Sequence, residues 1–453
     1  MGKRKGYRCA LIFLIFAVNG VVWAQWEPDR RLTSNQATSL TSRNSQWCIG
    51  ANGSGMVHIV FYDDRSGNNE IYYLRSTDNG LNWGAEMRLT DDTARSWTPS
   101  IAVTDSVVHL VWFDTRDGPN GEIYYLRSTD NGLSWSDEVR MSFDTARSEF
   151  PCVAAEGEDV ILVWRDNRDS RFSYEIYYRR SGDGGVTWSD ESRLTNAAGI
   201  KWNPSVAISG NLVHLVWADN RDGNWNVYYK RSTDHGVSWE ADLRLTENVF
   251  AQEWPCVAAR DSVVVVAYSD NEDVDGELFC VRSYDGGETW QEPVRISCGS
   301  AQPGIWSPNI AISGERVHAV WYDMRDGNAE IYYAFSTDSG QTWEERRLTE
   351  DSSRSNYPSV ALGGTLVHVV WTDFRDGPTG EIYYKRNPSG NVGIKEQGDE
   401  RLRGTGGKPV LLTQREKVEI FDASGQRVKG EPACGGVYFL KGKTGFQKRV
   451  FIR

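Results

Sequence analysis

The sequence lacks several features that would point to common classes of protein. Its 453 residues hold only seven cysteines, none in a C-x-x-C pair, and only six histidines. This sparse spacing matches neither the usual zinc site nor the dense disulfide framework of small secreted domains. Positive charge is also in deficit, because 50 Lys and Arg face 62 Asp and Glu, for a net charge of −12. The acidic balance argues against nucleic acid and anionic membranes as partners.

Long apolar runs are absent after the N-terminal segment. There, Lys and Arg residues at positions 3, 4, 5 and 8 precede an apolar run from Cys9 to Val22. A basic start, a short apolar run and a small residue at Ala24 predict a signal peptide over residues 1–24. A membrane anchor is the alternative, but the run is short for a bilayer. We therefore expect an exported chain with no transmembrane segment in its mature form.

Three of the six cysteines left after cleavage, Cys48, Cys152 and Cys256, recur at one position of a repeated unit. The other three are irregular. Cys280 and Cys298 could form a bridge across one hairpin, but the register of that hairpin cannot be derived from the sequence. The sequence therefore leaves this pairing open.

Aromatic residues, by contrast, are abundant, with 19 Trp, 20 Tyr and 15 Phe. Most of them belong to a unit that repeats about every 52 residues, a period typical of propellers and solenoids. One copy runs from Arg88 to Trp135 and reads R-L-T, W-T-P-S-I-A-V, V-V-H-L-V-W-F-D, T-R-D-G, E-I-Y-Y-L-R-S and T-D-N-G-L-S-W. Short runs rich in Val, Ile, Tyr and Trp between turn residues predict strands. We name the strands A at the proline, B at V-H-x-V-W, C at E-I-Y-Y and D at R-L-T.

Four antiparallel strands per repeat form one blade of a propeller. Strands A to C occur seven times, and one D strand, at Arg31, precedes the first A strand. We therefore expect an all-β fold over residues 28–386, a seven-bladed β-propeller of four-stranded blades. The N-terminal strand should pair with strand C of the last unit and so remove the exposed sheet edges. We expect a linker at residues 387–408 and a small β-rich C-terminal domain at residues 409–453. We also expect the chain to be a monomer.

The hairpin between strands C and D carries the pattern S-x-D-x-G-x-x-W in six repeats. This pattern resembles the Asp box, or BNR repeat, of sialidases and related propellers, and the resemblance implies a sialidase-like propeller fold. The box aspartates are Asp78, Asp130, Asp183, Asp234, Asp285 and Asp338. Ser and Asp can bond local backbone N–H groups, Gly can adopt positive φ, and Trp can fold back over the hairpin. We expect these boxes to be structural, because turn chemistry that recurs in every repeat serves the fold.

The B–C turn and the D–A loop must lie on the face opposite the Asp boxes. A repeated D-x-R-D-G turn places an arginine there in six repeats, at Arg65, Arg116, Arg168, Arg221, Arg325 and Arg375. These arginines could grip an acidic or polyhydroxyl ligand. Alternatively, each pairs with carboxylates of its own or the next blade and pins the turn. We favour the pairing because the motif recurs nearly unchanged.

An aromatic residue also precedes or opens strand A in every repeat. These residues are Trp47, Trp97, Phe150, Trp202, Trp254, Trp306 and Tyr357. Strand A should be innermost, so they would ring the central opening, where aromatic faces suit sugars or a protein partner. Packing between blades is the alternative. The five tryptophans are the candidates for ligand contact, and only Trp23, Trp26 and Trp225 lie outside all repeated positions.

Two features could suggest a metal. Five histidines share one position on strand B, namely His58, His109, His214, His318 and His368. Different blades hold them too far apart for one ion, so we expect hydrogen bonds between blades instead. In the fifth B–C turn, Asp273, Asp275 and Gly276 partly match the start of a calcium loop. A solvated acidic turn is the alternative, and Ca²⁺ is the single cofactor under consideration.

The same resemblance bears on activity. Sialidases use three arginines for the substrate carboxylate, a Tyr–Glu nucleophile pair, an Asp acid/base and an R-I-P motif. This sequence has no R-I-P motif, its face arginines all belong to repeats, and it predicts seven blades where sialidases have six. We expect an exported, non-catalytic propeller that binds a glycan or a cell-surface protein through the face opposite the Asp boxes. The alternative is an exo-sialidase-like glycoside hydrolase that acts on sialylated or related acidic glycans, with catalytic residues unassigned.

The C-terminal residues carry a second resemblance. V-E-I-F-D at 418–422, then Q-R-V, G-G-V-Y-F-L at 435–440 and K-R-V-F-I-R at 448–453 resemble the sorting domain of type IX secretion substrates. The resemblance implies bacterial export machinery as a partner and the cell surface or the medium as the location. A small β domain of unrelated purpose is the alternative.

Overall fold

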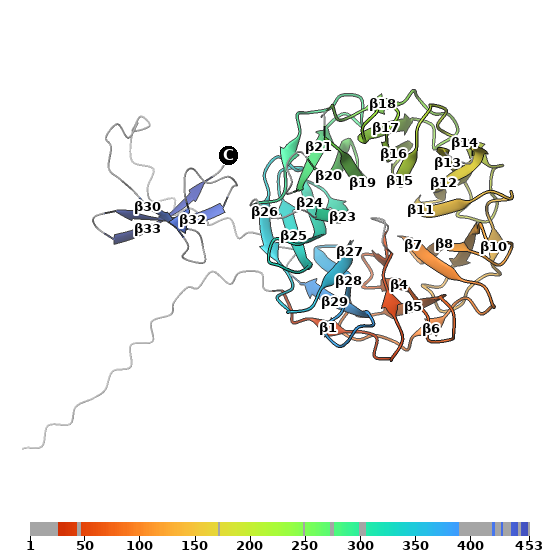
Figure 1. The fold of residues 1–453 in the computed structure, drawn as a ribbon, viewed down its shortest axis with the longest axis horizontal. Helices are drawn as coiled ribbons and strands as arrows, with labels where there is room; N and C mark the ends of the chain where they lie inside the picture. Colours follow the sequence, from red (N-terminus) through yellow and green to blue (C-terminus); the bar gives the residue numbers. More distant parts are fainter. Residues whose placement is uncertain are drawn as a thin grey trace, which may run out of the picture.

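The computed structural model describes residues 26–42, 47–170, 173–247, 250–271, 276–298 and 305–388, and short strands after residue 418. The regular elements of these segments are strands. Up to Asn387 they form seven sheets set radially around one axis, which confirms the predicted seven-bladed propeller (Figure 1). Among the described residues no helix is long and apolar enough to cross a membrane.

Five blades are continuous in sequence and run from an inner strand A to an outer strand D. Blade 2 comprises β7 (Ser96–Thr104), β8 (Val107–Asp114), β9 (Glu122–Ser128) and β10 (Val139–Arg140). Blade 3 comprises β11 (Ser148–Glu156), β12 (Asp159–Ser170), β13 (Ser173–Ser181) and β14 (Ser192–Arg193). Blade 4 comprises β15 (Lys201–Ser209), β16 (Leu212–Asp219), β17 (Asn226–Ser232) and β18 (Leu243–Arg244). Blade 5 comprises β19 (Gln252–Arg260), β20 (Val263–Asp270), β21 (Glu277–Ser283) and β22 (Val294–Arg295). Blade 6 comprises β23 (Ile305–Ser313), β24 (Arg316–Asp323), β25 (Glu330–Ser336) and β26 (Glu344–Arg347).

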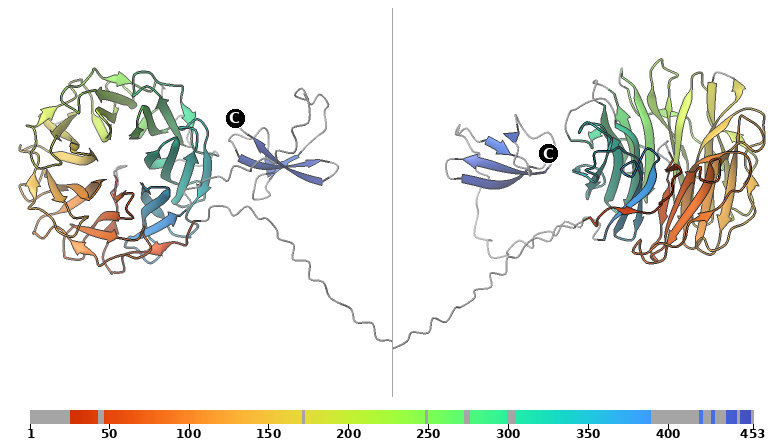
Figure 2. Two further views of the ribbon diagram at one scale, coloured as in Figure 1. Left: turned by 180° about the vertical axis from the view of Figure 1, so that it is seen from behind. Right: turned by 60° about the horizontal axis from the view of Figure 1, so that its bottom comes forward.

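The two ends of the propeller meet in blade 7. This blade comprises β27 (Ser355–Gly363), β28 (Leu366–Asp373), β29 (Glu381–Asn387) and the N-terminal β1 (Arg30–Arg31). β1 runs antiparallel to β29, with Arg30 opposite Tyr384 and Arg31 opposite Tyr383. The predicted closure of the ring by the N-terminal strand is therefore confirmed (Figure 2).

Blade 1 has an interrupted inner strand. It comprises β2 (Ser39–Leu40), β3 (Ile49–Ala51), β4 (Val57–Asp63), β5 (Glu70–Ser76) and β6 (Met87–Arg88). Leu40 lies opposite Tyr62, as Trp97 lies opposite Phe113 in blade 2. Leu40 therefore holds the position that the sequence comparison gave to Trp47, and Trp47 belongs to an insertion between β2 and β3. Because of these extra residues, Trp47 stands in the sequence where the other repeats have their strand-A aromatic residue.

The Asp boxes hold their hairpins through the expected local hydrogen bonds. In blade 2, Ser128 Oγ donates to Asp130 Oδ1 at 2.8 Å and accepts from the backbone N–H of Gly132 at 2.8 Å. Asp130 in turn accepts from the N–H and the hydroxyl of Ser134 at 2.9 and 2.5 Å. The Ser-to-Asp and Gly-to-Ser bonds recur in the other five boxes.

The tryptophan that closes each box packs against the preceding blade. Trp135 lies edge-on to Tyr73 of blade 1, with ring centroids 5.1 Å apart. The Tyr73 hydroxyl fills the space beside Gly132, where a Cβ would lie 1.8 Å from it. Blade 7 has no box, and Trp26 takes the equivalent place against Tyr333 of blade 6, at 4.9 Å. Trp26, which the sequence comparison left outside the repeat, therefore fills in blade 7 the position that the box tryptophan holds in the other blades.

The R-L-T motif fastens each outer strand to strand C. In blade 1, Arg88 pairs with buried Glu70 at 2.9 Å, and Thr90 accepts a hydrogen bond from the N–H of Ile71 at 2.8 Å. The closure uses the same contacts. Arg31 pairs with Glu381 at 2.7 Å, and the Thr33 hydroxyl donates to the same carboxylate at 2.5 Å. The first R-L-T copy thus serves as the outer strand of the last blade.

The strand-B histidines bond within a blade rather than between blades. His109 Nδ1 lies 2.8 Å from the hydroxyl of Tyr125 on the adjacent strand C, and the other four copies repeat this pair. Burial lowers the pKa of His109 to about 3. The expectation of inter-blade histidine bonds is therefore wrong, because adjacent strands of one sheet already bring the two side chains together.

The remaining described strands form a separate antiparallel sheet in the order β31-β30-β32-β33. They are β30 (Glu419–Phe421), β31 (Arg427–Val428), β32 (Gly436–Gly442) and β33 (Gly445–Phe451). Cys280 is free and buried whereas Cys298 is disulfide-bonded, so the two do not form a bridge with each other. The predicted signal peptide and nearly all of the predicted linker lie outside the described residues.

Candidate functional site

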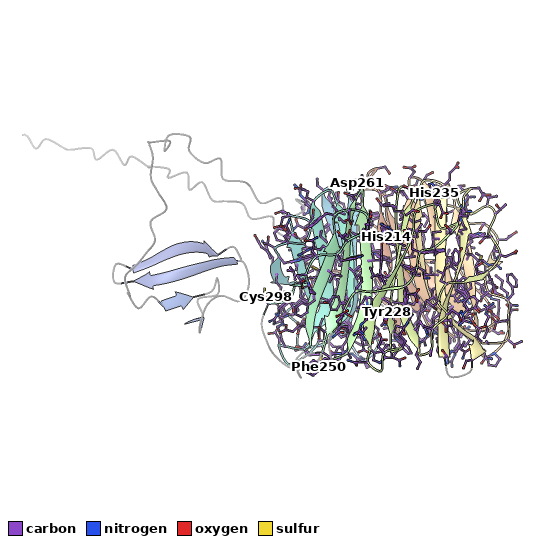
Figure 3. The ribbon with its side chains drawn as sticks, turned by 90° about the horizontal axis from the view of Figure 1, so that it is seen from above. His214, Tyr228, His235, Phe250, Asp261 and Cys298 are labelled. Carbon is purple, nitrogen blue, oxygen red and sulfur yellow. The ribbon has the colours of Figure 1, made fainter. Side chains whose placement is uncertain are left out.

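The propeller has two faces of different chemistry. The A–B turns and the Asp boxes share one face, where the N–H of Asn131 bonds to the carbonyl of Ser106 at 2.9 Å. The B–C turns and D–A loops lie on the other. In Figure 3, Asp261 and His235 mark the first face and Phe250 marks the second. We call these the Asp-box face and the turn face.

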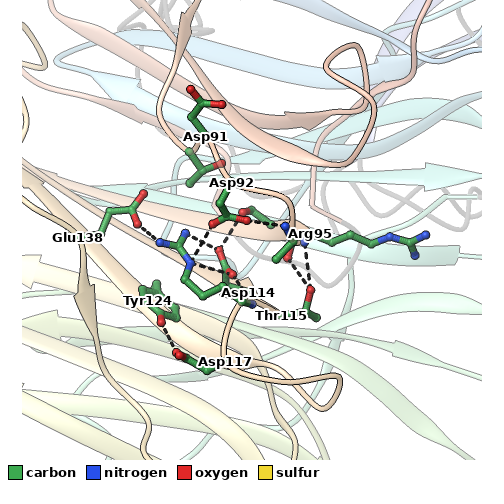
Figure 4. A network of polar contacts seen from close by, with 12 residues as sticks. Asp91, Asp92, Arg95, Asp114, Thr115, Asp117, Tyr124 and Glu138 are labelled. Carbon is green, nitrogen blue, oxygen red and sulfur yellow. Dashed lines mark hydrogen bonds and ion pairs between the residues drawn. The ribbon is translucent and has the colours of Figure 1, made fainter.

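The D-x-R-D-G arginines on the turn face are engaged by carboxylates, and Figure 4 shows the carboxylates Asp92, Asp114 and Glu138 that do so in blade 2. Arg116 pairs with Asp114 at 2.7 Å and with Asp92 at 3.0 Å, bonds Glu138, and lies 4.4 Å from the ring centroid of Tyr124. Pairs with two carboxylates recur at Arg65, Arg168, Arg221, Arg325 and Arg375. Carboxylate pairing, the alternative that the sequence favoured, is therefore present at all six arginines.

The aromatic residues that open strand A form two alternating sets. In blades 2, 4 and 6 the aromatic stands two residues before the proline, and in blades 3, 5 and 7 it stands directly before it. The first set is Trp97, Trp202 and Trp306, and the second is Phe150, Trp254 and Tyr357. We call these six residues the mouth ring.

All six mouth-ring residues are partly exposed. Each lies where the register between strands A and B shifts. The members directly before the proline have φ between 53° and 56°. Bulges of this kind re-aim side chains at the ends of strands. The inner strands surround the axis (Figure 1). The ring residues stand near the starts of these strands, so the ring lies at their turn-face end.

Polar side chains interleave with the mouth ring. Glu149, Glu253 and Asn356 occupy, in blades 3, 5 and 7, the position that tryptophan holds in blades 2, 4 and 6. Burial raises the pKa of Glu253, whose Oε2 accepts a hydrogen bond from the Asn271 amide at 3.4 Å. The mouth therefore offers aromatic faces beside hydrogen-bonding groups.

Arg165 on strand B of blade 3 gives the mouth its most asymmetric feature. Its Nη2 lies 2.5 Å from Glu149 Oε2, and its guanidinium carbon lies 3.6 Å from the ring centroid of Trp202. The rings of Phe150 and Tyr174 each lie 4.2 Å away. The Arg165 side chain is 5% exposed, burial lowers its pKa, and its Nη1 has no hydrogen-bond partner among the described residues.

Sequence reasoning missed Arg165 because it compared the repeats for what they share. At the same strand-B position the other blades carry Tyr62, Phe113, Ala218, Ser269, Tyr322 and Thr372. Arg165 is the one charged residue at this position, and a search for such departures from the repeat would have found it. The same search points to Trp225, whose ring lies 6.5 Å from that of Trp202. Both side chains place the asymmetry of the turn face at blades 3 and 4.

Two further candidates lie elsewhere. Trp47 is not part of the mouth ring, since its carbonyl accepts the N–H of Ile101 at 2.8 Å and its side chain packs against inner strands inside the channel. Asp273 and Asp275, the calcium candidates, lie outside the described residues. Among the residues that are described, no cluster of three or more His, Cys, Asp and Glu side chains could hold a metal.

The sequence is similar to those of known sialidases and xyloglucanases. Residues 144–369 match a family model described as a BNR repeat-like domain. A sialidase of Paraclostridium sordellii is 28% identical over 279 residues, which are 52% of this chain and 67% of that protein. A xyloglucanase of Acetivibrio thermocellus is 23% identical over 362 residues, which are 69% of this chain but only 40% of that protein.

Solved structures resemble this chain in fold. An ulvan lyase superimposes with a TM-score of 0.53 at 12% identity, over 77% of this chain and 95% of its own. A Trypanosoma rangeli sialidase superimposes with a TM-score of 0.50 at 14% identity, over 92% of this chain and 70% of its own. Six Asp boxes, seven radial blades and the matched repeat model agree with one another. The chain is a sialidase-like β-propeller built from BNR repeats.

Proposed function

We propose that this chain is an exported propeller that binds a glycan at the mouth ring without cleaving it. The observation that carries the proposal is the mouth itself, where six partly exposed aromatic side chains lie beside the partly exposed Glu253 and the buried Glu149 and Asn356. Aromatic faces stack on sugar rings, and neighbouring polar groups bond the hydroxyls. The relatives that are named for activity on sugar chains support a carbohydrate ligand.

The charges at the mouth favour binding over hydrolysis. Most glycosidases need two carboxylates about 5 to 10 Å apart, with environments that separate their pKa values. Glu149 is held in ion pairs by Arg165 and Arg147. The raised pKa of Glu253 has burial as its cause, and no described carboxylate contributes to it. Glycoside hydrolysis remains the second candidate, because burial raises the pKa of Glu253, which is the direction that favours a general acid.

Replacing Trp202 by Ala should lower the affinity for the best-binding glycan of an array about tenfold, because stacking on an aromatic ring contributes about 1.5 kcal/mol. Calorimetric titration of the purified chain measures this loss. Arg116→Ala is the matched control on the same face, since its side chain is already paired, and it should change affinity less than twofold. Equal losses in both variants, or none in Trp202→Ala, would place the ligand elsewhere.

Catalysis can be tested separately with a fluorogenic sialoside and a fluorogenic xyloglucan oligosaccharide. The binding proposal expects no turnover above that of a heat-denatured sample. Turnover that disappears in Glu253→Gln but persists in Asp338→Asn, an Asp-box control, would favour the hydrolase and contradict the proposal.

We also propose that the chain is exported through its N-terminal segment and sorted to the cell surface through its last residues, where it acts as a monomer. The basic and apolar N-terminus supports the first step. The strand pattern after residue 418 supports the second. Fractionation of cells that express the full chain should find it at the surface or in the medium. Retention in the cytoplasm would contradict this assignment.

A further inference from the structure

One position of the repeat carries an aromatic ring only in blades 3 and 4. It directly precedes the E-I-Y-Y motif of strand C or its variant, and it holds Tyr174 in blade 3 and Trp225 in blade 4. In the other five blades this position holds Asn69, Gly121, Gly276, Ala329 and Gly380. The hairpin that carries Tyr174 is also longer than its copies, because β12 and β13 continue beyond the pair of Asp166 and Glu175. The turn face therefore gains two partly exposed rings on adjacent blades.

Trp202, the mouth-ring residue of blade 4, lacks a support that its counterparts have. Trp97 lies opposite Phe113 on strand B of its own blade, with ring centroids 4.7 Å apart. Trp306 packs in the same way on the strand-B tyrosine opposite it, at 5.4 Å. The residue opposite Trp202 is Ala218, which offers no ring. Another group must therefore hold the Trp202 side chain.

Arg165 supplies this support from blade 3. Its guanidinium carbon lies 3.6 Å from the ring centroid of Trp202 and 4.2 Å from that of Tyr174. On the blade 4 side, the ring of Trp225 meets that of Trp202 edge-on, at 6.5 Å and 74°. The two additional rings thus adjoin Arg165 and Trp202. We call these four residues the Arg165 cluster.

Glu149 fixes the guanidinium group by its edge. It lies directly opposite Arg165 on the adjacent strand, and both side chains are buried. Nε and Nη2 of Arg165 donate to Glu149 Oε2 at 3.1 and 2.5 Å. A planar cation that is held by its edge leaves its faces to aromatic rings, which the ammonium group of a lysine cannot do. The orientation of the Trp202 ring therefore depends on Arg165.

We propose that Arg165 is a positioning residue of the mouth ring, which holds Trp202 in place for stacking on a sugar ring. The inference rests on the proposed function, since it assigns Trp202 a part in glycan binding. The Arg165 side chain is only 5% exposed, so its effect reaches the glycan through Trp202. Trp97 rests on a ring of its own blade and does not share this dependence.

A double-mutant cycle tests the proposal, with calorimetric titration of the best-binding glycan of an array. Arg165→Met should lower the affinity of the parent chain about fivefold, because most of the stacking on Trp202 is lost. In the Trp202→Ala background the same change should have an effect of less than about 1.5-fold, since residues that act through one contact are not additive. Arg147→Met is the matched control. It removes the other partner of Glu149, which is 47% exposed, and should change affinity less than about twofold.

A second measurement needs no glycan. Hydroxyl-radical oxidation of Trp202 in the free chain should rise at least about twofold in Arg165→Met, because the ring face that the guanidinium group covers becomes accessible. Oxidation of Trp97 should stay unchanged. Arg165→Lys keeps the charge beside Glu149 but lacks the planar group, so it should raise Trp202 oxidation as well. It replaces Arg165→Met in both measurements if that variant does not fold.

The outcomes separate this proposal from the glycan proposal. Equal loss of affinity from Arg165→Met in both backgrounds would overturn the positioning role, and so would full affinity in Arg165→Met beside a tenfold loss in Trp202→Ala. Either result would leave the glycan proposal standing. If Trp202→Ala binds as the parent chain does, the glycan proposal fails. The oxidation of Trp202 then decides whether Arg165 holds the ring, and unchanged oxidation in Arg165→Met would contradict it.

Discussion

Replacing both Trp26 and Arg31 by Ala is expected to lower the free energy of unfolding by about 5 kcal/mol and to open the ring. Loss of the packed tryptophan accounts for about 3 kcal/mol of this. Loss of the partner of a buried carboxylate accounts for about 2 kcal/mol. This is less than the usual loss for a fully buried ion pair, because the Arg31 side chain is 34% exposed. Glu381, with 2% of its side chain exposed, would then lack its nearest charged partner. Urea unfolding followed by tryptophan fluorescence measures the change.

The matched control is the double variant Trp83→Ala and Arg88→Ala. These residues make the same two contacts, with Tyr384 and Glu70, but their outer strand is joined to its blade by a hairpin. We expect a similar local loss and no opening of the ring. In the closure variant, β29 would present a free edge, which favours self-association. Size-exclusion chromatography should show dimers or aggregates in that variant alone, and identical elution of both variants would contradict the closure account.

Acid should destabilise the propeller strongly between pH 6.5 and pH 4. Burial lowers the pKa of all five strand-B histidines, to between about 3 and about 4. In the unfolded chain a histidine titrates near 6.5. The unfolded state therefore binds more protons in this window, so stability is complete above pH 6.5 and falls as the pH drops toward the folded pKa. At pH 5 the loss is about 2 kcal/mol for each histidine and about 10 kcal/mol for five.

Buried carboxyls oppose this loss, because burial raises the pKa of several of them. Burial raises the pKa of Glu122 to about 7, so its native state gains a proton as the pH falls. A single substitution isolates the histidine contribution from such effects. In His109→Val the difference in unfolding free energy between pH 7.5 and pH 5 should shrink by about 2 kcal/mol. Ile161→Val, at the same position of blade 3, is the control and should leave the difference unchanged. Equal pH dependence in His109→Val and the parent chain would show that the pKa of His109 is the same in the folded and the unfolded chain.

The repeat made most of the fold predictable. Strand periodicity, the six Asp boxes and the displaced first R-L-T strand were enough to derive seven blades and the closure between β1 and β29. These features depend on local turn chemistry and on the two-residue period of strands, both of which a sequence displays directly.

The site was less predictable, because it depends on contacts between segments far apart in the chain. The insertion in blade 1 moved Trp47 from the expected mouth ring into the channel, and only the pairing of Leu40 with Tyr62 reveals this. Trp26 lies in no repeat, yet packs as the seventh box tryptophan. Arg165 differs from its copies, but its burial among three aromatic rings requires blades 3 and 4 to meet.

The most direct test of the glycan proposal is hydroxyl-radical footprinting of the full chain with and without the best-binding glycan. The account predicts protection of the mouth ring, with Trp202 and Trp306 among the protected residues, and unchanged oxidation of the Asp-box residues Leu133 and Val186. Protection of Leu133 and Val186 with no change at the mouth ring would place the glycan on the Asp-box face and contradict the account.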